Sequence, residues 1–207
     1  RFTDGETPID NWTTAQKNLG FTSTTIEGEE VAHCYGKNGY LKLGDDKGHG
    51  ADLISPYTNT LRSDSLLMVS FRAFTDYMTG ARDDNKITVE VLGGGVIRDF
   101  AQSEKTTIDL EAGYYDISSE EFPEDMWEGH DFLVFVAGTK ANPITANTRV
   151  RIICGSLTQN SAVNNRIYLD NFYIRRLEAD EENYFTENNG SGKDIILGAP
   201  FDEEEQE

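Results

Sequence analysis

Basic residues, cysteines and long apolar runs are all scarce in this chain of 207 residues, and the scarcity excludes whole classes of protein. Only 18 lysines and arginines accompany 37 aspartates and glutamates, so the formal net charge is −19. Binding to nucleic acid or to an anionic membrane surface needs clustered basic side chains, and this balance argues against both. No apolar run approaches the roughly 18 residues that cross a bilayer, so we expect no membrane insertion.

The two cysteines, Cys34 and Cys154, lie in separate expected strands and leave two interpretations open. In an oxidising compartment they could form one disulfide. Otherwise they are two buried thiols that behave as small hydrophobes. The sequence has no Cys-x-x-Cys spacing, and its three histidines (His33, His49 and His130) are scattered. We therefore expect no zinc site.

Acidic residues are concentrated at the C-terminal end of the chain. Residues 178–207 hold 11 acidic side chains and one lysine, a net charge of −10, which leaves −9 for residues 1–177. The remaining length suits one β-sandwich domain. We expect this domain over residues 1–177, followed by an acidic C-terminal extension or linker over residues 178–207 within a larger polypeptide.

Apolar and polar residues alternate in many short segments that are separated by glycine-rich turns. The clearest segment is 65–74, and segment 86–92 is the next. The glycines at 93–95 then predict a hairpin turn into a strand at 96–100. No segment has a convincing amphipathic helix pattern, so the sequence predicts an all-β sandwich or barrel of about ten short antiparallel strands. The other expected strands are 21–26, 31–35, 39–43, 51–55, 106–110, 130–137, 148–154 and 165–176.

Three segments match a known family in order along the chain. They are Gly39–Gly44 followed by Gly48 and Leu53–Pro56, then Leu66–Ala73, and then Arg166–Ile174. With these segments, residues 1–177 resemble the galactose-binding-like jelly rolls of secreted and surface proteins of Bacteroidetes, which are related in shape to carbohydrate-binding modules. The resemblance implies a jelly-roll β-sandwich and a secreted or cell-surface location in a bacterium.

Asp170 lies among the apolar residues of the last expected strand, where a buried carboxylate needs a partner. In modules of the family that the chain resembles, a carboxylate at this place often binds a structural calcium ion. Calcium takes about six to eight oxygen ligands, so Asp170 needs further ones, and the candidates are Asp4, Asp10 and the backbone carbonyls of Gly44–Gly48. The alternative is that Asp170 accepts backbone hydrogen bonds or pairs with Arg149 or Arg166.

Sugar rings stack their C–H groups on exposed aromatic faces, while neighbouring polar side chains bind the hydroxyls. Four aromatic residues lie in or beside acidic loops, and they are the candidate ligand-binding residues: Tyr77, Tyr114, Tyr115 and Trp127. Alternation along a strand would expose one ring of the pair Tyr114 and Tyr115. The alternative for all four is a mostly buried ring with its polar tip at the surface.

Together these features predict a non-catalytic extracellular binding module that recognises carbohydrate. One alternative is a structural or adhesive domain of a larger bacterial surface protein. The other is a glycoside hydrolase or lyase domain. Hydrolysis would need two carboxylates about 5–9.5 Å apart across a cleft, and nothing in the sequence places two carboxylates in that relation.

Overall fold

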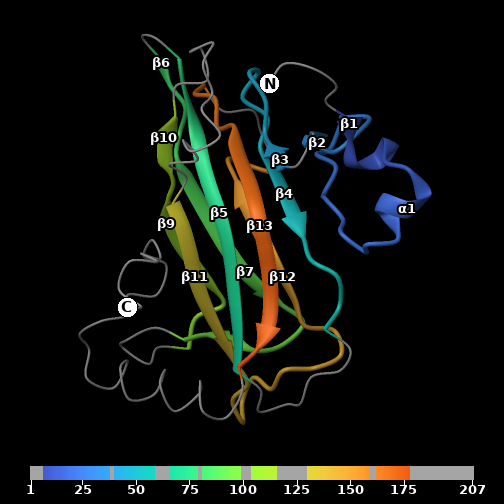
Figure 1. Ribbon diagram of the computed structural model, residues 1–207, viewed down its shortest axis with the longest axis vertical. Helices are drawn as coiled ribbons and strands as arrows, with labels where there is room; N and C mark the ends of the chain where they lie inside the picture. Colours follow the sequence, from blue (N-terminus) through green and yellow to red (C-terminus); the bar gives the residue numbers. More distant parts are fainter. Residues whose placement is uncertain are drawn as a thin grey trace.

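The computed structural model describes residues 7–37, 40–58, 66–78, 81–98, 104–115, 130–158 and 162–177. Strands dominate this part of the chain (Figure 1), accompanied by the 3₁₀ turn η1 (Ile9–Asn11) and the short helix α1 (Thr14–Lys17). No helix in these ranges is long and apolar enough to cross a membrane. The extension expected at 178–207 lies outside the described residues. The strands are β1 (Thr7–Pro8), β2 (Cys34–Lys37), β3 (Tyr40–Leu43), β4 (Ala51–Ile54), β5 (Leu66–Met78), β6 (Ala81–Arg82), β7 (Lys86–Leu92), β8 (Val96–Ile97), β9 (Thr107–Glu111), β10 (Gly113–Tyr115), β11 (His130–Ala137), β12 (Arg149–Cys154) and β13 (Ile167–Arg176).

The strands form two sheets that pack face to face. One sheet has the order β1-β2-β3-β13-β5-β11-β8, and the other has the order β4-β12-β7-β9. In Figure 1, β5, β11 and β13 lie in front of β7 and β12. The sheet centres, β3-β13-β5-β11 and β4-β12-β7-β9, interleave along the chain in the order of a jelly roll, and the short β10 is parallel to β5. The predicted all-β jelly-roll sandwich is confirmed.

The core lies between the two sheets and follows the alternation predicted from the sequence. On β5, the side chains of Leu67, Val69, Phe71 and Ala73 are all buried on one face. The ring of Phe71 stacks on Phe132 of β11, with 5.3 Å between the ring centroids. A phenylalanine buried in this way anchors the sandwich, because truncating such a side chain to alanine costs about 3–5 kcal/mol.

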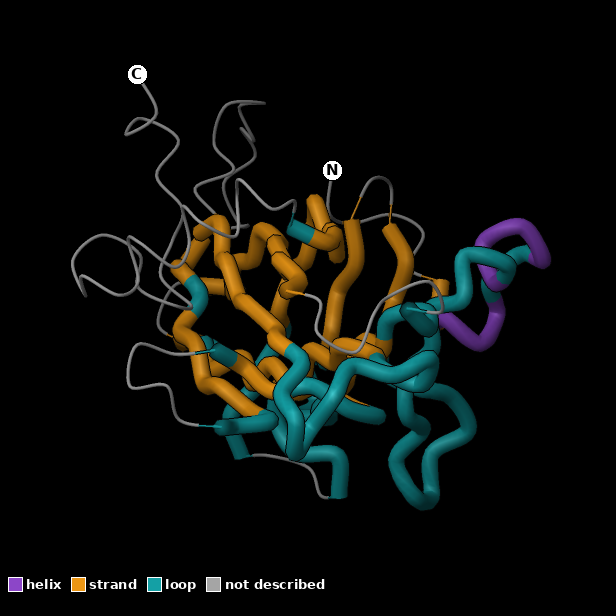
Figure 2. Tube along the Cα trace, turned by 90° about the horizontal axis from the view of Figure 1, so that it is seen from below, coloured by secondary structure: helices purple, strands orange, loops and turns teal. Residues whose placement is uncertain are grey.

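Residues 7–20 carry β1, η1 and α1 and lie beside the sandwich (Figure 2). Trp12 anchors this segment, because its indole is buried against the core and its Nε1–H donates to the carbonyl of Thr7 at 3.1 Å. Gly36 of β2 leaves room for the indole, since a side-chain carbon there would lie 2.8 Å from Nε1. A capping box between Thr13 and Gln16 begins α1.

The strand expected at 21–26 does not form in the described part of the chain, apart from an isolated bridge between Thr22 and Ile54. The buried carboxylate of Asp52 binds this segment instead. It accepts hydrogen bonds from the backbone N–H and the hydroxyl of Thr24, each at 2.6 Å. Because such side-chain bonds compete with a strand ladder, the segment docks beside β4 without extending the sheet.

The hairpin expected around Gly93–Gly95 is also wrong. Strand β7 belongs to the second sheet, whereas β8 pairs with β11 in the first. The three glycines have positive φ angles, and a side-chain carbon at Gly93 would lie 2.0 Å from the carbonyl oxygen of Asn147. The hydroxyl of Thr145 donates to the Gly93 carbonyl at 2.6 Å. The glycines therefore carry the chain across the sandwich from one sheet to the other.

Strand β13 changes the parity of its core-facing residues part of the way along. Ile167 and Leu169 are buried in the core, and further along the strand Phe172 and Ile174 pack against the same core. Since side chains alternate between the two faces of a regular strand, this switch from odd to even positions requires one extra residue.

A β-bulge supplies the extra residue. Asp170 lies opposite Arg72 of β5, and Tyr173 lies opposite Ser70, so three steps along β13 match two along β5. Asn171 has a φ angle of 50°, in the left-handed region that asparagine tolerates better than most residues. After the bulge, Phe172 and Ile174 are the side chains of β13 that face the core.

The two cysteines are free thiols, and both are buried in the core. Burial raises the pKa of Cys154 to about 12 and raises the pKa of Cys34 even further. Of the two interpretations left open by the sequence, the structure shows the buried thiols.

Candidate functional site

Among the aromatic residues predicted to bind ligand, Tyr114 is the one whose side chain the structure describes. The residue is 37% exposed, its hydroxyl donates to a backbone carbonyl at 3.0 Å, and the guanidinium carbon of Arg82 lies 5.2 Å from the ring centroid. Tyr77 and Tyr115 are residues of β5 and β10, and Trp127 lies outside the described residues. A ligand-binding role for these four residues stays a prediction.

The residues predicted to bind calcium accept backbone hydrogen bonds. The carboxylate of Asp10 accepts one from the N–H of Ala32 at 2.8 Å. Asp170 is half-buried at the bulge and accepts one from the N–H of Asn171 at 2.7 Å. Asp4 lies outside the described residues, and within those residues neither Asp10 nor Asp170 belongs to a group of three or more potential metal ligands. The calcium site stays a prediction.

The two most deeply buried carboxylates in the described part of the chain, Asp52 and Asp83, are elsewhere, and they pair with arginine. Asp83 accepts two hydrogen bonds from the guanidinium of Arg166, at 2.7 and 2.9 Å. Asp52 and Glu90 share the guanidinium of Arg151, at 2.8 and 3.1 Å. These arginines hold the carboxylates in ion pairs, which is a structural arrangement and differs from the separate acid and base of a hydrolase.

A groove of about 330 Å³ opens beside the C-terminal half of β13, and we call it the β13 groove. This volume is at the lower end of the range for small-molecule sites, which is about 300–1,000 Å³. The lining of the groove combines aromatic rings with polar and basic side chains. It includes Phe21, Pro56, Tyr57, Thr58, Phe172 and Arg176.

The bulge in β13 provides the floor of the β13 groove. It turns Phe172 toward the core side of the sheet, where the ring packs edge-on against Phe21 with 5.8 Å between centroids. The ring of Phe71 lies 6.5 Å from that of Phe172, with an angle of 30° between the ring planes. Without the extra residue, the regular alternation of the strand would place Phe172 on the opposite face.

Tyr57 is the exposed aromatic residue of the β13 groove, with 54% of its surface accessible. The guanidinium of Arg149 lies over its ring, 4.4 Å from the centroid, and the Nε–H of Arg149 donates to the carbonyl of Ser55 at 2.7 Å. This cation–π contact holds the ring in one orientation while much of it stays open to solvent.

The β13 groove and Tyr114 lie at opposite ends of β5. Leu67, which lines the groove, is near the start of β5, whereas Tyr114 pairs opposite Thr75 near its end. At about 3.3 Å per residue, the two positions are about 25 Å apart along the strand. A ligand at the groove and a ligand at Tyr114 would therefore occupy separate sites.

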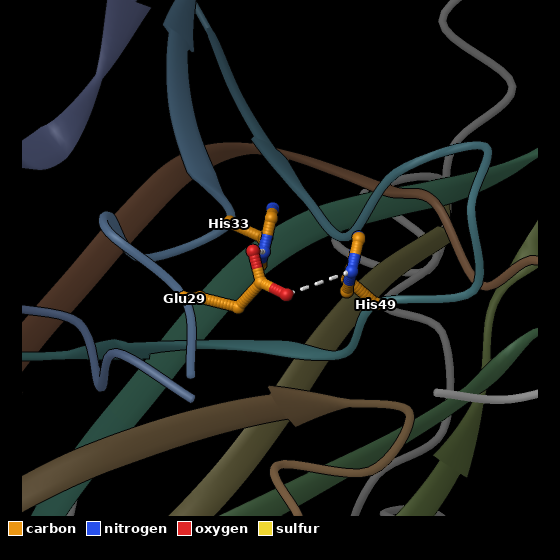
Figure 3. Close-up of side chains that lie close together, drawn as sticks. All are labelled: Glu29, His33 and His49. Carbon is orange, nitrogen blue, oxygen red and sulfur yellow. Dashed lines mark ion pairs between the residues drawn. The ribbon is translucent and has the colours of Figure 1, made fainter. Parts of the chain in front are cut away.

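Four ionisable side chains, Glu29, His33, Asp45 and His49, form a second arrangement that we call the His33–His49 cluster. The two imidazole rings are parallel, with 4.0 Å between their centroids. Figure 3 shows the carboxylate of Glu29 beside both rings. One oxygen of Glu29 lies 3.3 Å from Nε2 of His49, and the other lies 3.4 Å from Nε2 of His33. The cluster joins the segment before β2 to the loop between β3 and β4.

Asp45 contacts Nδ1 of His49, the ring nitrogen that does not face Glu29. Its carboxylate lies 2.5 Å from Nδ1 of His49 and also accepts hydrogen bonds from the backbone N–H groups of Lys47 and His49, at 2.9 and 3.1 Å. Burial raises the pKa of Asp45, but these hydrogen bonds outweigh it and hold the pKa below its ordinary value. Because an ionised carboxylate only accepts, Nδ1 of His49 carries a proton.

His33 is buried more completely, with 6% of its surface exposed. Its Nδ1 lies 2.8 Å from the hydroxyl of Tyr35. Its Nε2 is buried and has no hydrogen-bond partner among the described residues, although it faces Glu29. A buried polar atom without a partner is uncommon and calls for an explanation.

The prediction that the histidines are scattered is wrong for His33 and His49, whose rings stack on each other. A weak signal was present in the sequence, because each histidine follows a carboxylate by four positions: Glu29 precedes His33, and Asp45 precedes His49. The spacing does not show that two loops 16 residues apart meet. The backbone N–H of Gly44, which donates to the carbonyl of His33 at 2.9 Å, brings them together.

The fold and these two sites define the chain as a jelly-roll sandwich with an aromatic groove and a histidine–carboxylate cluster. No protein-family model and no curated protein matches it. Among solved structures, it is similar to the N-terminal cellulose-binding domain of β-1,4-glucanase C from Cellulomonas fimi, with 10% identity, a TM-score of 0.41, and 76% of this chain and 89% of that chain covered. It is also similar to the exoplasmic/lumenal domain of VIP36 in a form bound to Ca²⁺ and Man3GlcNAc, with 11% identity, a TM-score of 0.32, and 86% of this chain and 97% of that chain covered. Similarity at this level assigns no ligand to the chain.

Proposed function

We propose that this protein is a non-catalytic carbohydrate-binding module of a secreted or cell-surface protein, and that the sugar binds in the β13 groove. The observation that carries the proposal is the oriented, half-exposed ring of Tyr57 at the edge of a small groove with an aromatic floor. One face of a hexose ring is rich in C–H groups and packs on an aromatic ring. The hydroxyl groups at the edge of the sugar ring need polar partners.

The β13 groove offers both kinds of contact. Tyr57 provides the aromatic surface, and Phe172 closes the floor so that a bound ring is removed from water on two sides. Thr58 and Arg176 provide polar groups beside the aromatic surface. Since the ring of Tyr57 is already held by Arg149, little side-chain entropy is lost when a ligand packs against it.

The test is an array of neutral and acidic oligosaccharides, followed by isothermal titration with whichever sugar binds. We expect the Tyr57→Ala variant to lose about tenfold in affinity, the loss of about 1.4 kcal/mol that is typical of truncating a central aromatic contact. Tyr173→Ala is the matched control, because Tyr173 is also an exposed tyrosine, at 61%, but does not line the groove. Its affinity should equal that of the wild type.

Two outcomes would redirect the proposal. If Tyr114→Ala abolishes binding and Tyr57→Ala does not, the sugar binds at the other end of β5, as the sequence analysis predicted. If no oligosaccharide binds and the protein is folded, carbohydrate recognition is refuted, and the interpretation as a structural or adhesive domain takes its place.

A further inference from the structure

We propose that Glu29, His33 and His49 form a binding site for one divalent transition-metal ion of the zinc class. The Nε2 atoms of both histidines and a carboxylate oxygen of Glu29 are the ligands, and the ligand atoms all lie within 4.8 Å of one another. Neither the proposed sugar site nor the predicted calcium site includes any of these residues.

Two distances in the cluster match the spacing of adjacent ligand atoms around a tetrahedral ion, and the parallel rings have to rotate before both Nε2 lone pairs point at that ion. Zinc binds histidine nitrogen and carboxylate oxygen at about 2.0–2.2 Å, so two ligand atoms at adjacent corners of the tetrahedron are about 3.4 Å apart. Nε2 of His49 and Nε2 of His33 lie 3.3 and 3.4 Å from the oxygens of Glu29. Both separations exceed the usual range of an N–H···O hydrogen bond, which is about 2.7–3.2 Å.

The unpartnered nitrogen of His33 is a second, independent observation. Only 6% of His33 is exposed, and its buried Nε2 has no hydrogen-bond partner within the described ranges, yet it faces the Glu29 carboxylate. An imidazole nitrogen in this position loses its contact with water and gains only a 3.4 Å contact with the carboxylate, which is too long for a good hydrogen bond. A metal ion bound to Nε2 removes that cost.

The partners of the other ring nitrogens prepare both histidines to bind a metal. Asp45 accepts the Nδ1 proton of His49, so in neutral His49 the lone pair is on Nε2. The hydroxyl of Tyr35 lies 2.8 Å from Nδ1 of His33, where it can accept the corresponding proton. Metal-binding histidines almost always donate their other N–H to a carboxylate, carbonyl or water, and the carboxylate at His49 follows that pattern.

The donor set also indicates the class of ion. Two imidazoles and one carboxylate suit zinc and its neighbours in the transition series, whereas calcium takes oxygen ligands alone. Glu29 is the most exposed member of the cluster, so the ion can enter from solvent beside it. Three protein ligands leave the fourth corner of a tetrahedron for water.

The experiment uses the full chain, without a histidine tag and stripped of metal with a chelator, and titrates it calorimetrically with Zn²⁺. We expect one equivalent to bind, and we expect Co²⁺ at the same site to show the visible absorption of a four-coordinate ion. Glu29→Gln removes a ligand on the exposed side of the cluster, where the fold tolerates change, and should lower the affinity at least tenfold. Asp45→Asn should lower it about 10- to 100-fold.

Glu30→Gln is the matched control, because Glu30 is an exposed neighbour and its substitution removes the same charge. Its affinity for zinc should equal that of the wild type, as should that of Asp170→Asn. If Glu30→Gln weakens binding as much as Glu29→Gln does, the ion is held only by the acidic surface and the site is refuted. If the wild-type chain takes up no Zn²⁺, the proposal is also wrong, and the cluster is a hydrogen-bonded ion pair.

Discussion

Removing the arginine that pairs with Asp83 should be among the most destabilising substitutions in the chain. The Asp83 side chain is only 3% exposed, and Arg166 binds it through Nε at 2.7 Å and through Nη2 at 2.9 Å. An Arg166→Met substitution keeps much of the side-chain volume but leaves a buried carboxylate without its counterion. Breaking a buried pair from one side costs about 3–5 kcal/mol.

The assay is urea unfolding, supported by thermal melts. For a domain of this size, about 1 kcal/mol corresponds to about 2–4 °C, so Arg166→Met should lower the melting temperature by about 6–20 °C. In the double variant Asp83→Leu/Arg166→Met both charges are gone. Its loss of stability should therefore be smaller than the sum of the two single losses, because no charge remains buried alone.

An exposed ion pair in the same protein provides the control. Nζ of Lys86 lies 3.1 Å from the carboxylate of Asp109, but the two side chains are 56% and 60% exposed. Lys86→Met should therefore cost less than about 1 kcal/mol. The reasoning is refuted if Arg166→Met costs no more than Lys86→Met, or if the effects of the Asp83 and Arg166 substitutions simply add.

Two further predictions concern the core and the crossover between the sheets. Burial raises the pKa of both thiols, so a thiol-reactive dye at pH 8 should leave Cys34 and Cys154 unlabelled in the native protein. The same dye should label both cysteines in denaturant. Rapid labelling of the native protein would contradict this prediction. Gly93→Ala should destabilise the protein far more than Gly28→Ala in urea unfolding. Both glycines have positive φ, but only a side-chain carbon at Gly93 meets another atom, the carbonyl oxygen of Asn147 at 2.0 Å, so equal losses would show that this contact does not matter.

Strand positions were predictable where one face of a strand is buried. The segments at 86–92 and 130–137 match β7 and β11 to the residue. In segment 86–92 each second residue is apolar because one face fills the core, whereas segment 130–137 contains a continuous apolar run because β11 is buried on both faces. The hairpin at Gly93–Gly95 shows the limit of this reasoning. Alternation identifies a strand but does not show which sheet it joins.

The bulge in β13 was readable in principle but was not predicted. The apolar residues at 167 and 169 and those at 172 and 174 have opposite parity, and only an inserted residue reconciles them with one core. In a regular strand over residues 165–176, Phe172 would not point into a groove with Tyr57, which is more than 100 residues earlier in the chain.

The sequence by itself determined the class of fold and the faces of the central strands. These properties depend on composition and on the local alternation of side chains, which are present in any short window of residues. Tertiary structure alone decided that Glu29, His33 and His49 converge, that the cysteines are buried as free thiols, and that Asp52 and Asp83, rather than Asp170, are the deeply buried carboxylates. Those properties depend on which loops meet in the folded chain, such as the loop between β3 and β4 and the segment before β2, which the hydrogen bond from Gly44 to His33 joins.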